Sequence, residues 1–227
     1  MRNKLLSVAL ACVGFISLLG GTAAAAPTDG TDAARTCTGV RLTGSLPVPP
    51  AGMAVRQTVT IEPDCTPRKG PVQYVPATRA ATAGASTRSL AATDATTRHL
   101  RSWNEMYDCC NIRMTGLYTT ADWTVDNGRI RTAAATSTQG FNREPWNAGW
   151  SLKSATNSQD CATDCAAVNA VANADFTYQG IFDVTGKWYA NTHHSAVQLT
   201  ADGTPACTFD VNLKHTFIGW NWQHGCE

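Results

Sequence analysis

Alternation of apolar and polar residues is the main pattern in the second half of this chain. Its longest example runs from Cys207 to Phe217, where every second residue is apolar or His and the others are Thr, Asp, Asn and Lys. A period of two is typical of a strand with one buried face and one solvated face. Shorter alternating sets cover residues 112–119, where Ile112, Met114, Gly116 and Tyr118 alternate with Arg113, Thr115 and Thr119, and residues 176–182. With tight-turn signals at 126–128 and 202–203, they predict a mainly β fold, an antiparallel β-sandwich or barrel.

Two segments depart from this alternation. The Ala-rich stretch from Cys161 to Ala174 has Val168 and Val171 at helical spacing, and it predicts a short helical insertion in the β fold. Residues 97–107 also have large apolar side chains spaced for one side of a short helix. Both segments are expected to interrupt the strands.

The first 25 residues have the layout of a secretory signal peptide. Arg2 and Lys4 precede an apolar run, and small residues close it at Ala23 to Ala25, where we expect cleavage. The apolar run is shorter than the roughly 20 residues that a membrane-spanning helix needs. We therefore expect a secreted, extracellular protein that has no membrane association once the leader is removed.

The rest of the chain divides by composition. Apolar positions on both sides of a Pro-rich stretch at 46–52 predict two arms of a hairpin, closed by a disulfide between Cys37 and Cys65. Residues 76–98 are rich in Ala, Thr, Ser and Arg and offer little to bury. The predicted organisation is a signal peptide at 1–25, a small N-terminal β unit at 26–75, an Ala/Thr-rich linker or mobile loop at 76–98 and a main β-rich domain at 99–227.

Eight cysteines follow the leader, and an even number in an exported chain indicates a disulfide framework. We expect the bridges Cys37–Cys65 and Cys207–Cys226. Because adjacent cysteines rarely pair with each other, we expect Cys109 and Cys110 to bond separately to Cys161 and Cys165. The alternative for these last four cysteines is a four-thiolate zinc site.

Charge and motifs exclude several functions. The formal charge is +1, and it becomes −1 when Arg2 and Lys4 leave with the signal peptide, so a nucleic-acid partner is not expected. No Gly-x-Ser-x-Gly nucleophile motif is present in the sequence. His193, His194 and His215 are weak candidates for a metal site. Neighbouring residues of a strand point to opposite faces, so His193 and His194 could not both bind one metal in an extended segment. We expect no metal, no cofactor and a monomer.

Indole side chains are the most suggestive feature. All seven tryptophans lie between residues 103 and 222. The predicted binding residues are Trp220, Asn221, Trp222, Gln223, Trp188 and Tyr189. In an extended segment Trp220 and Trp222 would share one face, with Asn221 and Gln223 on the other. Aromatic faces beside amides suit sugar rings, although core packing is the alternative for any single tryptophan.

The sequence therefore predicts a secreted, non-catalytic protein that binds an extracellular glycan or cell-wall polymer through exposed tryptophans. One alternative is a secreted protease inhibitor or another protein-interaction domain. The other is a hydrolase whose carboxylates or histidines meet only in the folded protein.

Overall fold

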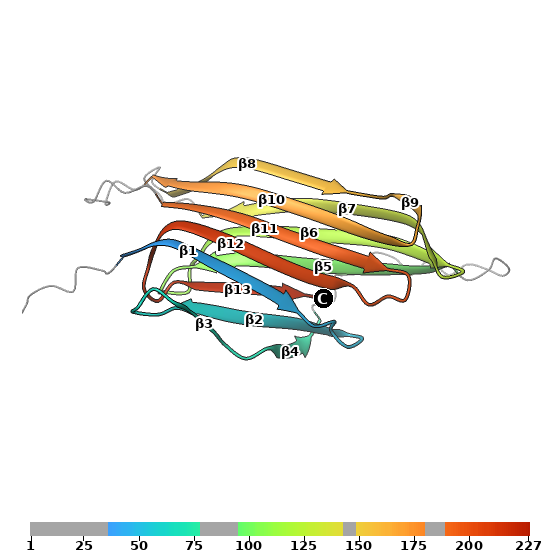
Figure 1. The fold of residues 1–227 in the computed structure, drawn as a ribbon, viewed down its shortest axis with the longest axis horizontal. Helices are drawn as coiled ribbons and strands as arrows, with labels where there is room; N and C mark the ends of the chain where they lie inside the picture. The colour runs from blue at the N-terminus through green and yellow to red at the C-terminus, as the bar shows by residue number, and fades with distance from the viewer. Residues whose placement is uncertain (1–35, 78–94, 143–148, 180–188) are drawn as a thin grey trace, which may run out of the picture. The chain divides into compact units, whose positions relative to one another are not determined.

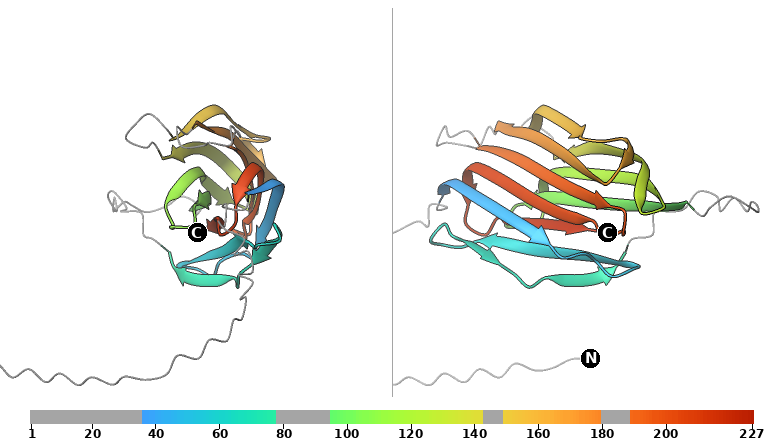
Figure 2. Two further views of the ribbon diagram at one scale, coloured as in Figure 1. Left: turned by 90° about the vertical axis from the view of Figure 1, so that its left-hand side faces the viewer. Right: turned by 45° about the vertical axis from the view of Figure 1, so that its right-hand side comes forward.

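Two antiparallel sheets make up the part of the protein that the structure describes. The computed structural model describes residues 36–77, 95–142, 149–179 and 189–227. One sheet has five strands in the order β1-β12-β11-β10-β8, and the other has the order β3-β2-β13-β5-β6-β7-β9, with β4 also paired to β2. Figures 1 and 2 show the two sheets stacked face to face. The predicted β-sandwich is confirmed.

The strands have the following bounds. The five-stranded sheet contains β1 (Thr36–Leu46), β8 (Gly149–Gln159), β10 (Ala167–Gln179), β11 (Tyr189–Thr200) and β12 (Ala206–Phe217). The other sheet contains β2 (Met53–Ile61), β3 (Pro67–Lys69), β4 (Gln73–Pro76), β5 (Thr96–Tyr107), β6 (Arg113–Asp126), β7 (Arg129–Phe141), β9 (Thr163–Cys165) and β13 (Asn221–Cys226).

Strand β12 forms as its alternation predicts. Cys207, Phe209, Val211 and Leu213 are buried between the sheets, each at 3% exposure or less. The turn between β6 and β7 is also confirmed, since Asn127 and Gly128 both have positive φ, at 50° and 70°. Such angles at both central residues belong to the tight turns that suit the twist of a hairpin.

The expected N-terminal hairpin is wrong. Strand β1 pairs with β12 in one sheet, whereas β2 pairs with β13 in the other. The segment between residues 36 and 76 is therefore part of the sandwich, within one compact unit that extends from Ala34 to Glu227. The Pro-rich connection does not turn β1 back onto itself but carries the chain from one sheet to the other.

Two disulfides join the sheets. Cys37 on β1 is bonded to Cys65, which follows β2, and Cys207 on β12 is bonded to Cys226 on β13. Both pairs agree with the expected pairing. Each bridge ties a strand of the five-stranded sheet to the other sheet, so the two layers are covalently linked.

Neither predicted helix exists, because both segments are strands. In β10, Val168, Ala170, Ala172, Ala174 and Phe176 are buried at alternate positions. The helical expectation for Cys161 to Ala174 failed because Ala serves on the inner face of this strand, and Ala gives a poor signal of strand periodicity. In β5 the inward positions include the buried polar residues Ser102 and Asn104, which interrupt the apolar alternation.

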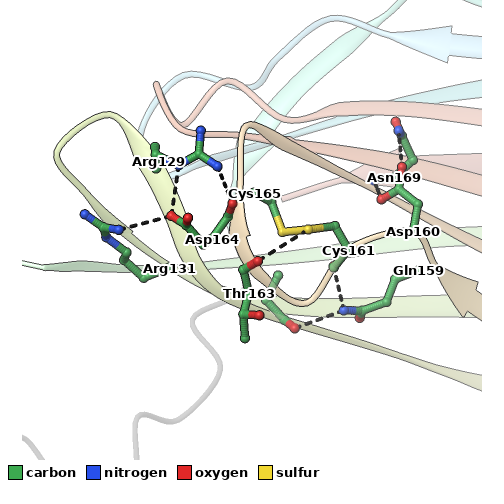
Figure 3. The surroundings of a disulfide bond; sticks show 10 residues. Arg129, Arg131, Gln159, Asp160, Cys161, Thr163, Asp164, Cys165 and Asn169 are labelled. Atoms are coloured by element: carbon green, nitrogen blue, oxygen red, sulfur yellow. Dashed lines mark hydrogen bonds and ion pairs between the residues drawn. A yellow bond between two sulfur atoms is a disulfide. The ribbon is translucent and has the colours of Figure 1, made fainter.

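The predicted partners of Cys109 and Cys110 are also wrong. Cys161 and Cys165 are bonded to each other, with their Cα atoms 6.2 Å apart (Figure 3). Without a helix, a tight loop can bring the two cysteines to bonding distance. Asp160 anchors this loop, because its carboxylate accepts two hydrogen bonds from Asn169, one from the backbone N–H at 2.8 Å and one from the side-chain Nδ2 at 2.7 Å. The pairing also removes two ligands from the alternative zinc site.

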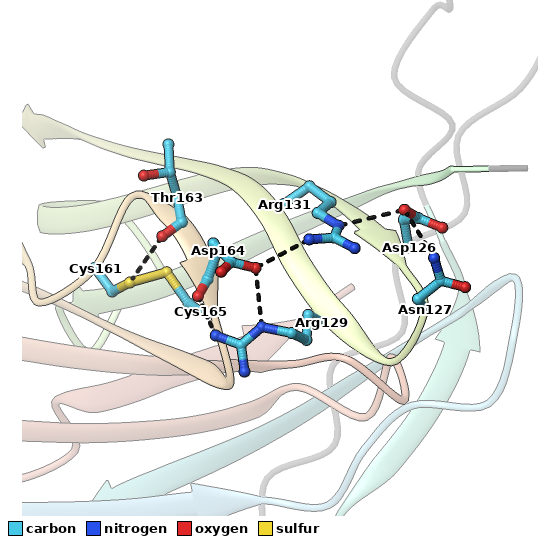
Figure 4. A network of polar contacts seen from close by, with 8 residues as sticks. All are labelled: Asp126, Asn127, Arg129, Arg131, Cys161, Thr163, Asp164 and Cys165. Carbon is cyan, nitrogen blue, oxygen red and sulfur yellow. Dashed lines mark hydrogen bonds and ion pairs between the residues drawn. A yellow bond between two sulfur atoms is a disulfide. The ribbon is translucent and has the colours of Figure 1, made fainter. Parts of the chain in front are cut away.

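Charged side chains hold the same loop against β7. Asp164, in the left-handed conformation at φ 54°, accepts hydrogen bonds from Arg129 at 2.9 Å and from Arg131 at 3.1 Å. Arg131 continues to Asp126 at 3.3 Å, so the network reaches the β6–β7 turn (Figure 4). The two guanidinium groups lower the pKa of Asp164. Because Arg129, Arg131 and Asp164 are exposed, the network contributes modest stability and mainly fixes the loop.

Some predictions fall outside the described residues. They are the signal peptide at 1–25, most of the 76–98 linker and Trp188. Within the described ranges, no helix has the length and apolar character needed to cross a bilayer.

Candidate functional site

The structure separates the predicted binding residues. Trp222 is fully buried, and its Nε1–H donates to Asn104 Oδ1 at 2.6 Å. Asn221 and Gln223 lie on the outer face of the sheet, where they donate to the Asp108 carbonyl and to Asn111 Oδ1. The alternation predicted for residues 220–224 is therefore present. However, the indole of Trp222 packs in the core, so it cannot contact a ligand.

The candidate histidines do not form a metal site. His193 is completely buried, with Nδ1 3.1 Å from Asn104 Oδ1 and Nε2 2.9 Å from Thr115 Oγ1. His194 follows it in β11 and contacts Asn173 Oδ1 at 2.7 Å, while His215 contacts Thr38 at 3.3 Å. Among the described residues, no three His, Cys, Asp or Glu side chains converge as metal ligands would.

Trp220 and Tyr189 meet in a cavity at one end of the sandwich, which we call the aromatic cavity. Its volume is about 320 Å³, and Trp150, Tyr178 and Phe217 also line it, with Ile218, Asp108 and Cys109. Gly219, at φ 83°, makes the bend that places Trp220 between β12 and β13. Trp150 and Tyr178 come from β8 and β10, so the cavity depends on segments that are far apart in the sequence.

Two free thiols stand beside the aromatic cavity. Cys109 and Cys110 are exposed, and their Sγ atoms are 3.7 Å apart. Asp108 Oδ1 accepts the backbone N–H groups of Cys110 and Ile112, which fixes the turn that carries the two cysteines. The hydrogen bond with Cys109, together with the charges of Cys109 and Asp108, raises the pKa of Cys110.

We expect Cys109 and Cys110 to be unconnected to the other cysteines. Digestion without reduction should give no peptide that links either of them to Cys161 or Cys165. Iodoacetamide, applied to folded protein after mild reduction, should label these two thiols first because they are exposed. Labelling of Cys110 should rise with pH, because alkylation needs the thiolate and the raised pKa of Cys110 keeps the thiol protonated at lower pH. A cross-linked peptide joining Cys109 or Cys110 to another part of the chain would contradict this assignment.

A second concave site lies on the outer face of the larger sheet, and we call it the outer groove. It has a volume of about 230 Å³. Its lining residues are Ala54, Arg56, Val75, Arg101, Trp103, Glu105, Tyr118 and Glu227. Trp103 on β5 and Tyr118 on β6 are direct cross-strand partners, and both line this groove.

Glycines make room for both rings. A Cβ atom at Gly225 would lie 1.9 Å from the Trp103 indole, so this ring covers the backbone of β13. A Cβ atom at Gly116 would lie 2.9 Å from the Tyr118 hydroxyl, and one at Gly140 would lie 3.3 Å from the same ring. Glycine within a strand often marks such a close approach. The bare backbone thus lets the rings lie low on the sheet.

Polar contacts hold the groove side chains in place. Both oxygens of Glu105 are used: Tyr107 donates to Oε2 at 2.9 Å, and the Tyr118 hydroxyl donates to Oε1. Arg113 donates to Tyr118 at 2.7 Å and contacts Glu105 at 3.4 Å. Burial and the neighbouring carboxylate raise the pKa of Tyr107 to about 12, and the pKa of Tyr118 is also raised. Both phenols therefore remain hydrogen-bond donors at neutral pH.

Sequence reasoning missed Trp103 and Tyr118 as site residues. Trp103 lay on a predicted helix, and Tyr118 was grouped with Ile112, Met114 and Gly116 on one face of an alternating set. In fact Thr115 and Thr119 are buried, at 0% and 3% exposure, and Tyr118 occupies the outer face. The available signal was the pair of strand glycines, Gly116 and Gly225, but only strand pairing shows which aromatic ring covers each.

Comparison of the chain with protein-family models, with curated proteins and with solved structures finds no match, so its candidate sites are defined by geometry alone.

Proposed function

We propose that the chain is a secreted, non-catalytic protein that binds an extracellular glycan or cell-wall polymer in the outer groove. The observation that carries this proposal is the partly exposed indole of Trp103, which lies over Gly225 and lines a groove with charged side chains. A sugar presents flat C–H faces and a rim of hydroxyl groups. An aromatic ring surrounded by hydrogen-bonding groups complements both features.

The groove supplies those hydrogen-bonding groups on both sides of Trp103. Arg101 and Glu105 lie two residues before and after it, on the same face of β5. Arg101 is paired with Glu227 at 3.4 Å, and Arg56 donates to Gln73 at 3.1 Å. These partners restrict the side chains before a ligand arrives, which reduces the ordering cost of binding.

Binding fits this arrangement better than catalysis does. Two carboxylates, Glu105 and Glu227, line the groove, and paired carboxylates are what glycoside hydrolysis needs. However, the Glu105 carboxylate already accepts hydrogen bonds from two phenol hydroxyls, and the Glu227 carboxylate forms an ion pair with Arg101. The backbone of Glu227 is hydrogen-bonded to that of Arg101, four residues from Glu105, so the backbones of the two glutamates lie about 13 Å apart along the strand direction. Each carboxylate is thus held by its own partners before a ligand binds.

The test is retention of the oxidised protein on cellulose, chitin, xylan and purified cell wall, with Trp103→Ala as the variant. We expect native protein to bind one of these polymers and Trp103→Ala to lose affinity about tenfold or more, the effect of one lost stacking contact. Tyr74→Ala is the matched control, because Tyr74 is exposed on β4 and does not line the groove. Thermal unfolding checks that each variant is folded.

Either of two results would overturn the proposal. Equal retention of native protein and Trp103→Ala would show that the outer groove is not the site. Release of soluble reducing sugar from a retained polymer would show that the protein is a hydrolase. If no polymer is retained, the protein-interaction alternative takes precedence.

A further inference from the structure

The aromatic cavity has the geometry of a cage for a cation. Four of its rings form a closed cycle of neighbours, with centroid distances of 5.5 Å from Trp150 to Tyr178 and 6.1 Å from Tyr178 to Tyr189. The cycle closes through Trp220, which is 6.1 Å from Tyr189 and 6.3 Å from Trp150. The point midway among these centroids therefore lies within about 6 Å of each of them, the range of a cation–π contact.

The charges around the cavity favour the same kind of ligand. Among the described residues that line it, Asp108 supplies the one carboxylate, and no Lys, Arg or His accompanies it. Asp108 is held in place, because its Oδ1 accepts two backbone N–H groups and its carbonyl accepts Asn221 Nδ2. The negative faces of the rings and this carboxylate both attract a positive charge.

The rings are also fixed before a ligand binds. Trp150, Tyr189 and Trp220 have exposures of 4%, 3% and 7%, and Tyr189 stacks on Phe217 at 5.3 Å. The rings come from β8, β10, β11 and the bend before β13, so both the five-stranded sheet and the link to the other sheet position them. A cage of this kind loses little side-chain entropy when it binds.

We propose that the aromatic cavity binds a quaternary ammonium group, with Trp150, Tyr178, Tyr189 and Trp220 as the cage and Asp108 as the counter-charge. A primary ammonium carries three N–H donors that need acceptors, whereas an alkylated ammonium needs none and buries its methyl groups against the rings. The volume of about 320 Å³ is within the range of small-ligand sites. This site is separate from the outer groove and does not rest on glycan binding.

The test is titration of the full chain, by calorimetry and tryptophan fluorescence, with choline chloride and with its uncharged carbon isostere 3,3-dimethylbutan-1-ol. Both ligands have the same shape, so their difference isolates the charge; sodium chloride holds the ionic strength constant. We expect saturable binding of choline, at least about tenfold tighter than the alcohol. Equal affinities would overturn the proposal and leave only an apolar cavity, and the absence of saturable binding by choline would also overturn it.

Variants locate the site. Trp220→Leu keeps an apolar side chain but removes one ring face, and Asp108→Asn keeps the Oδ1 acceptor of the turn but removes the charge. Both should weaken choline binding by about tenfold while affecting the alcohol less. Trp103→Phe in the outer groove is the matched control and should leave choline binding unchanged. A loss of choline binding in Trp103→Phe, but not in Asp108→Asn or Trp220→Leu, would contradict the assignment.

Discussion

Acidification from pH 7 to pH 4 should destabilise the protein by about 3 kcal/mol for each of two buried histidines. His193 and His224 are both fully buried, and burial lowers the pKa of each to about 3. In the unfolded chain a histidine binds its proton near pH 6.5. Between the folded pKa of about 3 and the unfolded pKa near 6.5, the unfolded state binds more protons than the folded state. The free energy of unfolding therefore falls as the pH falls through this range. Above pH 6.5 the contribution is constant.

Urea unfolding at a series of pH values measures this effect. The variant His224→Phe isolates one of the two groups, because His224 stacks on Trp222 at 3.8 Å and its ring nitrogens have no hydrogen-bond partner among the residues that the structure describes. Replacing an unpaired buried imidazole by an apolar ring should cost little at pH 7. We expect the slope of unfolding free energy against pH, between pH 4 and 6, to fall by about half. An unchanged slope in His224→Phe would contradict the prediction.

Asn104→Ala should destabilise the protein by about 3–5 kcal/mol at pH 7. Asn104 is fully buried on β5 and connects the two sheets. Its Nδ2 donates to the His194 carbonyl at 3.0 Å, and its Oδ1 accepts Trp222 Nε1–H at 2.6 Å and faces His193 Nδ1 at 3.1 Å. Truncation leaves these buried groups without partners and opens a small cavity between the sheets.

The measurement is the free energy of unfolding in urea, with Asn157→Ala as the matched control. Asn157 lies on β8 and is exposed, so its truncation should change stability by less than about 0.5 kcal/mol. Emission from Trp222 should also change in Asn104→Ala, because its indole N–H loses its acceptor. A destabilisation of Asn104→Ala no larger than that of Asn157→Ala would show that the buried network is not a major source of stability.

The same network explains why the sequence pattern was misleading in β5 and β6. Asn191 donates to Thr115 at 3.0 Å, and Thr115 Oγ1 is 2.9 Å from His193 Nε2, so polar residues occupy inward positions on three strands. A period of two is recognised in a sequence by apolar residues at the inward positions. Because some inward positions of β5 and β6 are polar, β5 was predicted as a helix and the outer face of β6 was predicted to be the apolar one. Asn104 and Thr115 find hydrogen-bond partners on β11 of the other sheet, which local sequence cannot show.

The candidate sites were predicted less well than the fold. Trp220 and Tyr189 do line a cavity, but Trp222 belongs to the core, and Trp103 was not among the predicted binding residues. A tryptophan in a strand has the same local sequence signature whether it faces the core or the solvent. The face of the sheet on which the tryptophan lies depends on the pairing register of its strand and on the side chains of the opposing sheet.

The class of fold, the strand at 206–217 and the turns at 126–128 and 202–203 could be predicted from the sequence, because they depend on local periodicity and turn chemistry. The tertiary structure was needed to show that β1 and β2 enter different sheets, so that Cys37–Cys65 and Cys207–Cys226 link the two layers. It was also needed to show that Cys161 bonds to Cys165 and which aromatic rings meet. Strand pairing joins residues that are far apart in the chain, as with Trp150 and Trp220, and one register sets the face of every side chain in a strand. Both candidate sites are products of that pairing.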